Sequence, residues 1–288
     1  MLKCTGRCAT ANRFWVLESG VWDASDTTHW ATTSGAGVGG ASVPGSGDVA
    51  IFNELSAPLG GTCTVNTTVT VQQITMGLFT GTLDFSANNN NVTLSVAFSG
   101  TGTGTRTLNM GNGTWLIQGF NSNTWDCTTV TGFTLNANSS TLSFIPSTPT
   151  PTGNINFASG GKSYNIVTHS GVTNSQPFNI QGAPTIATLI MTAPANVAFA
   201  SGTTTTITNA PAWIGTSSNQ LFIGSNTATA VATVVLNAAG GTAQWAAIRA
   251  LTVTTNALTA TNSFDLKSNT LITITPPATG GGARIVSG

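Results

Sequence analysis

Apolar and polar residues alternate one by one in many short segments of the chain, and Gly, Asn, Ser and Thr separate these segments. In residues 62–73 (TCTVNTTVTVQQ), Val65, Val69 and Val71 share one face of an extended chain. Since a period of two places alternate side chains on opposite faces of a strand, this pattern predicts short, half-buried strands. The same alternation recurs in Val92/Leu94, Leu108/Met110, Trp115/Ile117, Phe133/Leu135, Tyr164/Ile166, Leu189/Met191 and Phe264/Leu266.

The expected fold class is therefore all-β. The strands recur about every 9–12 residues, a spacing that suits a β-sandwich, a jelly-roll or a parallel β-solenoid. Residues 238–251 are the one stretch whose spacing would also suit a helix.

Three features favour the solenoid. The one Asn-Gly pair, typical of tight hairpins, is Asn112-Gly113. The apolar positions come as short couplets, and runs such as Asn88–Asn91 and Thr203–Thr206 suit ladders of stacked like residues. We predict a right-handed parallel β-helix with roughly 20–25 residues per turn; the alternative is a β-sandwich or jelly-roll.

Charged residues are concentrated near the start of the chain. Half of them lie between Lys3 and Glu54, together with Trp15, Trp22 and Trp30, whereas none occurs between Lys162 and Arg249. We predict a Trp-rich attachment or capping module over residues 1–60 and a β-helical body over 61–288. The exposed end of a solenoid must be covered, which leaves two alternatives for the C-terminal end: a separate cap formed by the last ~40 residues, or a partner chain.

Composition narrows the function classes. Charged residues make up 6% of the chain, against about 25% in an ordinary globular protein. The net charge is zero and no basic cluster occurs, so no nucleic-acid partner is expected. No run approaches the ~20 apolar residues of a membrane helix, and the start has no apolar secretory stretch. We expect assembly in a cytoplasm, which predicts thiols at Cys4, Cys8, Cys63 and Cys127 rather than disulfides.

An enzyme that cleaves glycans needs two carboxylates in one site. The body has three acids, of which Asp84 and Asp265 lie between apolar residues and should point outward, far apart along a solenoid. Asp126, beside the aromatic Trp125, is the remaining candidate for glycan contact. The alternative is that Asp126 holds a turn and that Trp125 packs in the core.

The two histidines lack the acid and nucleophile of a catalytic triad. His29 is expected to pack or hydrogen-bond within the Trp-rich segment, and His169 to face solvent in a Thr-His-Ser-Gly turn. The Gly-rich residues 35–40 lack the strand, helix and Lys of a phosphate loop. We therefore expect no catalytic residue, no metal and no cofactor.

Residues 14–52 carry a set of short motifs: Phe14-Trp15-Val16, Gly20-Val21-Trp22-Asp23, His29-Trp30, Gly40-Ala41-Ser42-Val43-Pro44 and Asp48 to Phe52. This set resembles a module of structural proteins from environmental and marine bacteriophages. The Thr/Gly-rich body is similar to the β-helical part of those proteins, so that the resemblance covers residues 13 to about 210. The Gly- and Trp-containing closing segment of that family is missing here.

The resemblance implies a non-enzymatic virion component, either a head decoration or fibre, or a tail-associated appendage, located in the virion. By analogy it implies a homotrimer that contacts other capsid or tail proteins and a host-surface glycan. The candidates for virion attachment are Phe14, Trp15, Trp22, Asp23 and Trp30; the alternative is that the tryptophans only cap the body. Two other functions are a glycan-binding or glycan-cleaving tailspike and a bacterial surface adhesin.

Overall fold

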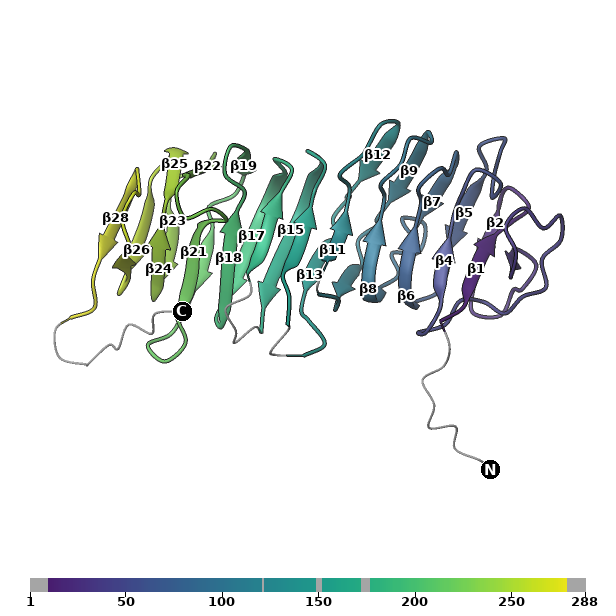
Figure 1. The fold of residues 1–288 in the computed structure, drawn as a ribbon, viewed down its shortest axis with the longest axis horizontal. Helices are drawn as coiled ribbons and strands as arrows, with labels where there is room; N and C mark the ends of the chain where they lie inside the picture. Colours follow the sequence, from purple (N-terminus) through teal and green to yellow (C-terminus); the bar gives the residue numbers. More distant parts are fainter. Residues whose placement is uncertain (1–9, 121, 149–151, 172–176, 279–288) are drawn as a thin grey trace, which may run out of the picture.

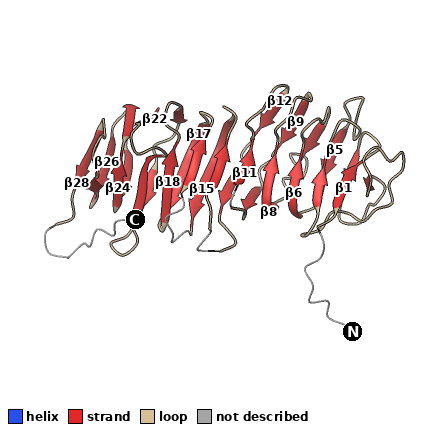
Figure 2. Cartoon of the chain, viewed as in Figure 1, coloured by secondary structure: helices blue, strands red, loops and turns tan. Residues whose placement is uncertain are grey.

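The computed structural model describes residues 10–120, 122–148, 152–171 and 177–278. In this part of the chain every regular element is a strand, and no helix is present that could cross a membrane. The strands stack side by side into an elongated body, with β1 at one end and β28 at the other (Figures 1 and 2). The all-β prediction is confirmed.

The strands are short, as the alternation predicts. Their bounds are β1 Asn12–Trp15, β2 Gly20–Trp22, β3 Trp30–Ala31, β4 Val49–Ile51, β5 Thr62–Val65, β6 Val69–Thr75, β7 Thr82–Asp84, β8 Val92–Ser99, β9 Arg106–Asn109, β10 Thr114–Ile117, β11 Ser122–Asp126, β12 Phe133–Asn136, β13 Thr141–Phe144, β14 Ile155–Ala158, β15 Ser163–Ser170, β16 Phe178–Gln181, β17 Thr185–Thr192, β18 Ala195–Phe199, β19 Thr204–Ile207, β20 Ala212–Ile214, β21 Leu221–Ser225, β22 Ala232–Leu236, β23 Gly241–Gln244, β24 Ala246–Arg249, β25 Leu251–Thr255, β26 Leu258–Thr261, β27 Phe264–Asp265 and β28 Ile272–Thr275.

Almost all strand pairs are parallel and join one turn of the chain to the next. Val69, Val92 and Trp115 lie side by side on β6, β8 and β10, so each pair of neighbours marks one full turn of the chain. Near the other end, Leu258 lies directly beside Ile272 on β26 and β28, and this turn takes fewer residues than those near β8. The result is a long, solenoid-like stack whose turns shorten toward the C-terminal end.

Two sheets share the strands. The larger has 23 strands and runs the length of the body, whereas the smaller has five, in the order β12-β9-β7-β5-β2. Figure 1 shows these five side by side in the N-terminal half. The smaller sheet ends at β12, and the next turn passes from β14 to β15 with only a short connection. The smaller sheet therefore does not continue beyond the turn that contains β12.

A single apolar core fills the stack. It extends from Trp15 to Ala260, and it is continuous across the expected boundary at residue 60. Inward-facing residues form columns along the body; one column contains Ile74, Phe98 and Trp125, in matching positions of successive turns. The parallel register thus converts the period-two pattern into one shared interior.

The Asn run does form contacts between turns, but not as a ladder of like residues. The side chains of Asn88 and Asn90 donate to the backbone oxygen of Val65 in the preceding turn. Asn89 and Asn91 instead accept backbone N–H groups of the following turn, at 2.9 and 2.8 Å. The run therefore connects three successive turns, because each amide carries both donors and an acceptor.

One expectation is wrong, and one ambiguous stretch is resolved. His169 does not lie in a solvent-facing turn: it belongs to β15 and is 1% exposed. The stretch around Trp245 is not helical, because β23 and β24 run through it and pair with neighbouring turns.

The two ends of the core differ. At the first turn, β3 pairs antiparallel with β1 and occupies its outer edge. At the last turn, β28 pairs with β26 alone among the described strands, and a hollow of about 470 Å³ lies open beside it. Its lining mixes apolar side chains, Phe264, Leu266, Ile272 and Ile274, with the polar Ser263 and Asp265. Residues 279–288, part of the candidate C-terminal cap, lie outside the described residues.

Candidate functional site

The three N-terminal tryptophans form a small buried core. Trp15, Trp22 and Trp30 are each at most 1% exposed. Trp30 meets Trp15 edge-on at 5.3 Å between ring centroids and Trp22 at 4.9 Å, the arrangement that aromatic quadrupoles favour. Phe52 packs among them and contacts Phe79 of the next turn at 5.3 Å. These indoles fix the first turn to the body, and their faces are not available to a partner.

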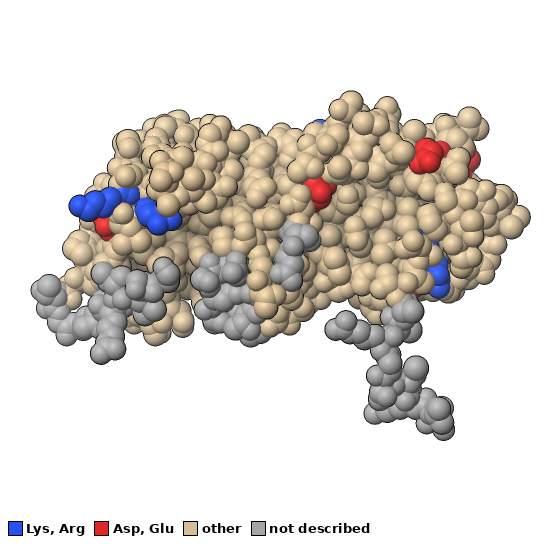
Figure 3. Space-filling model, in the orientation of Figure 1, with Lys and Arg blue, Asp and Glu red and all other residues tan. Residues whose placement is uncertain are grey.

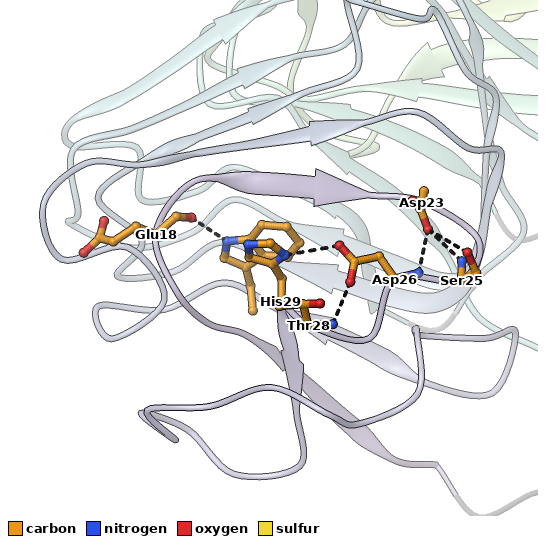
Figure 4. Close-up of polar contacts among 7 residues, drawn as sticks. Glu18, Asp23, Ser25, Asp26, Thr28 and His29 are labelled. Carbon is orange, nitrogen blue, oxygen red and sulfur yellow. Dashed lines mark hydrogen bonds and ion pairs between the residues drawn. The ribbon is translucent and has the colours of Figure 1, made fainter.

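His29 and two acids hold the loop that leads into Trp30 (Figure 4). The His29 ring stacks on Trp15 at 4.8 Å, and its Nδ1 lies 3.5 Å from Oδ2 of Asp26. Asp23 accepts the backbone N–H groups of Ser25 at 2.7 Å and of Asp26 at 2.6 Å. These backbone hydrogen bonds hold the pKa of Asp23 below its ordinary value. The predicted attachment residue Asp23 thus already has a structural task.

The exposed surface at this end comes from residues that the sequence analysis did not select. Phe14, on β1, is only partly exposed. Leu55 and Leu59 are exposed, Leu59 to 91%, and Val38 is exposed on the long loop before β4. Glu18 accepts the backbone N–H of Leu59 at 3.2 Å. In the sequence, this surface could have been recognised from apolar residues that lie outside the alternating segments.

Trp125 and Asp126 point in opposite directions from β11. Trp125 is fully buried, stacks on Phe98 at 4.4 Å and donates to the Tyr164 hydroxyl at 3.0 Å. It therefore has no ring surface for a sugar, and the interpretation of Trp125 as a glycan contact is wrong. Asp126 accepts from Thr101 Oγ1 at 2.9 Å and from the Thr128 backbone N–H at 3.0 Å.

The Asp126 carboxylate consequently joins the corners of two successive turns. Desolvation alone would raise its pKa, but the hydrogen bonds from Thr128 and Thr101 outweigh this effect and hold the pKa of Asp126 below its ordinary value. This is the turn-holding alternative that the sequence analysis left open.

Arg106 is a buried cation that the sequence analysis did not identify. It is 1% exposed, and its guanidinium lies 5.0 Å from the centre of the Phe133 ring. Its N–H groups donate to backbone oxygens of two neighbouring Gly- and Thr-rich loops, namely those of Gly100, Gly102, Gly104, Thr129 and Thr131. Burial lowers the pKa of Arg106. The sequence feature that could have indicated this role is the single Arg in GTGTGTRT. A Gly- and Thr-rich loop leaves backbone carbonyls unpaired, and a buried Arg can supply the donors that they need.

His169 occupies an inward position between Phe144 and Met191 of the adjoining turns. Its Nδ1 lies 3.0 Å from the Phe144 backbone oxygen, and its ring stacks on Phe178 at 4.6 Å. Its Nε2 has no hydrogen-bond partner within the described part of the chain. Burial lowers the pKa of His169 to about 4, so the imidazole is neutral at pH 7.

Two thiols are also buried in the core. Cys63 and Cys127 are free, and burial raises the pKa of Cys127 to about 12. Because the thiolate is the reactive form, these sulfurs are poor nucleophiles. Cys4 and Cys8 lie outside the described residues.

The remaining aspartates of the body and of the loop before β4 accept backbone N–H groups of their own turns, as Asp23 and Asp126 do. Asp48, Asp84 and Asp265 accept the backbone N–H groups of Gly45, Ser86 and Lys267, respectively, at 2.8–2.9 Å. Within the described residues, no three of the His, Cys, Asp and Glu side chains gather where they could hold a metal ion. The carboxylates thus act one at a time, each at a turn.

Comparisons with protein-family models, with curated proteins and with solved structures find no match to this chain. The charged side chains are distributed unevenly along the body. Figure 3 shows basic side chains near the C-terminal end, where Arg249 and Lys267 are exposed. Five of the acids instead lie between Glu18 and Glu54.

Proposed function

We propose that this chain is a non-catalytic structural component of a bacteriophage particle, a head decoration or fibre or a tail-associated appendage, built as a right-handed parallel β-helix. The observation that carries the proposal is the use of its acids: six aspartates accept backbone N–H groups of their own turns, at 2.6–3.0 Å. A carboxylate bound in this way stabilises a loop instead of activating water or a nucleophile.

The exterior also favours a particle component. Neighbouring turns are joined on the outside by neutral pairs, such as Asn209 to Thr188 at 2.9 Å and Asn136 to Asn109 at 2.8 Å. Salt screens ion pairs between exposed charges but has little effect on neutral hydrogen bonds and packing. A body held in this way keeps its stability when ionic strength changes outside the host.

The attachment surface in this proposal is the N-terminal end. The buried tryptophans give it rigidity, and the exposed Val38, Leu55 and Leu59 give it the apolar area that protein interfaces use at their centres. Three copies assemble around one axis, by analogy with the phage proteins that the N-terminal motifs resemble.

Mass spectrometry and immunogold labelling of purified particles test the proposal, using a phage whose genome encodes this chain. The expected result is peptides of the chain in a fixed ratio to the major capsid protein, with gold on head or tail. Particles washed in high salt serve as the control for loosely bound protein. Absence of the chain from washed particles contradicts the proposal.

Light scattering on the purified chain tests the trimer, for which we expect three times the 29.2 kDa of one copy. A Leu59→Asp variant is expected to remain folded but to be lost from particles. Release of reducing ends from host polysaccharide would instead indicate a glycan-cleaving tailspike.

A further inference from the structure

A groove lies on the outside of the stack at the place where the smaller sheet ends. It has a volume of about 710 Å³, within the ~300–1,000 Å³ of small-molecule sites. The side chains that line it are uncharged, and most carry an amide or a hydroxyl: Ser86, Asn109, Asn136, Asn138, Ser163 and Asn165. Leu135, Ala137 and Ala187 add small apolar areas between them.

One wall of the groove is the open edge of β12. The backbone oxygen of Gly132 accepts from Arg106 N–H at the start of β9, and that of Asn136 accepts from Met110 N–H directly after β9. The alternate residues Phe133 and Leu135 therefore direct their backbone groups away from β9. Lys162 Nζ already donates to the Phe133 oxygen at 2.6 Å. Leu135 is left with a backbone donor and acceptor that face the groove, and β12 has no strand partner on this side among the described residues.

The amides along this wall keep free hydrogen-bonding groups. Asp84, Asn109 and Asn136 form one outward column across β7, β9 and β12, and Asn136 Nδ2 donates to Asn109 Oδ1 at 2.8 Å. Asn165 Nδ2 donates to the Ser140 oxygen at 3.3 Å. These bonds leave Asn136 Oδ1 and Asn165 Oδ1 as acceptors and Asn109 Nδ2 as a donor at the groove.

We propose that this groove binds a neutral saccharide. Sugar hydroxyls both donate and accept, which matches a lining of amides, hydroxyls and a strand edge, and the C–H faces of a sugar ring can pack on Leu135 and Ala187. Among the residues that the structure describes, no Lys or Arg lines the groove, so phosphate, nucleic acid and acidic glycans have no counter-charge there. The site differs from Trp125 and Asp126, and the inference does not depend on a place in a virion.

A printed array of neutral and acidic glycans, followed by calorimetric titration of the best neutral hit, tests this site. Ser163→Trp places a large side chain in the groove from an exposed position at the start of β15. Asn136→Ala removes one free acceptor. The matched control is Asn209→Ala, which removes an exposed amide outside the groove that donates to Thr188 Oγ1 at 2.9 Å.

The expected result is binding of at least one neutral glycan, abolished by Ser163→Trp, weakened about tenfold by Asn136→Ala and unchanged by Asn209→Ala. Circular dichroism and thermal unfolding of each variant establish that it is folded. Failure of every neutral glycan, binding that survives Ser163→Trp, or selective binding of acidic glycans or an extended peptide overturns the proposal. The presence of the chain in particles would stand in any of these cases, since the particle assay does not require glycan binding.

Discussion

The first two thirds of the stack and its last third are filled differently. From Trp15 to Phe178 the core contains most of the large buried rings, whereas β22 to β26 bury mainly Leu, Val and Ala, including Ala243, Ala246 and Ala260. The turns differ in the same sense: one turn carries the chain from Trp115 to its neighbour Leu142, but a shorter one suffices from Gly241 to Leu258. Wide turns enclose more space and need large side chains, because protein interiors pack densely.

The comparison indicates that turn length and side-chain size vary together along the stack. The two buried basic side chains, Arg106 and His169, both lie in the wide, aromatic part. The narrow part ends at the open hollow beside β28, whose residues are at most half buried. We therefore expect stability to be greatest in the aromatic part and lowest at β27 and β28.

Removal of one ring from the wide part should have the largest effect. Trp115 is fully buried and contacts Phe85 at 4.7 Å, so Trp115→Ala leaves a large cavity. We expect a loss of about 3–5 kcal/mol in the free energy of unfolding, measured by urea titration. The control Ile214→Ala, at a position 51% exposed, should change it by less than about 0.5 kcal/mol. Equal effects of the two variants would contradict a core that depends on its rings.

His169 should make the wide part sensitive to acid. Its folded-state pKa is about 4, below the ~6.5 of an unfolded chain, so the unfolded state binds more protons between these values. Stability should fall as the pH decreases from about 6.5 to 4, by up to about 3 kcal/mol. His169→Phe keeps a ring in contact with Phe178 and should remove this part of the pH dependence. An identical pH profile for both proteins would show that His169 is not buried as a neutral group.

Arg106 should stabilise the two Gly- and Thr-rich loops of the wide part. Arg106→Met keeps much of the side-chain length but leaves the carbonyls of Gly100, Gly102 and Gly104 without their donor, which we expect to lower the free energy of unfolding by about 2–3 kcal/mol. Limited proteolysis should then cut within residues 100–105 and 128–132. Wild-type stability and resistance to cleavage would contradict this role.

Overpacking should distinguish the narrow part. Ala260 is fully buried in one of the short turns near the C-terminal end, so Ala260→Phe must displace its neighbours. We expect a loss of about 1–3 kcal/mol on the same urea titration. If the larger ring were accommodated without loss, the narrow turns would not be filled by their small side chains.

The hollow beside β28 should tolerate change best. Leu266 is only partly buried there, and Leu266→Ala should alter the free energy of unfolding by less than about 0.5 kcal/mol. A larger loss would show that the C-terminal end is covered in solution.

Much of the fold follows from the alternation. Leu83 and Phe85 are buried with Asp84 between them, as the period of two predicts, and the core position of the three N-terminal tryptophans follows from their size. The error at His169 has a specific cause. The sequence suggested that Tyr164 and Ile166 share the inward face, but the phase shifts within β15, so that Tyr164, Val167 and His169 point inward.

The candidate site was less accessible to prediction. Whether Trp125 is a surface ring or a core ring depends on which face of β11 meets Phe98, a contact from another turn. The amide groove depends on the end of the smaller sheet at β12, which brings Asn136 and Asn165 together from different turns. Neither arrangement leaves a local pattern, because both come from the register between turns.

Hydrogen exchange of the native protein, followed strand by strand with mass spectrometry, tests the central claim that one continuous stack is strongest where its turns are wide and aromatic. We predict the slowest exchange in β8, β10 and β13, intermediate exchange in β22 and β25, and fast exchange in β27 and β28. The slowest exchange in the C-terminal strands, or two protected units separated by a fast boundary near residue 60, would contradict the account.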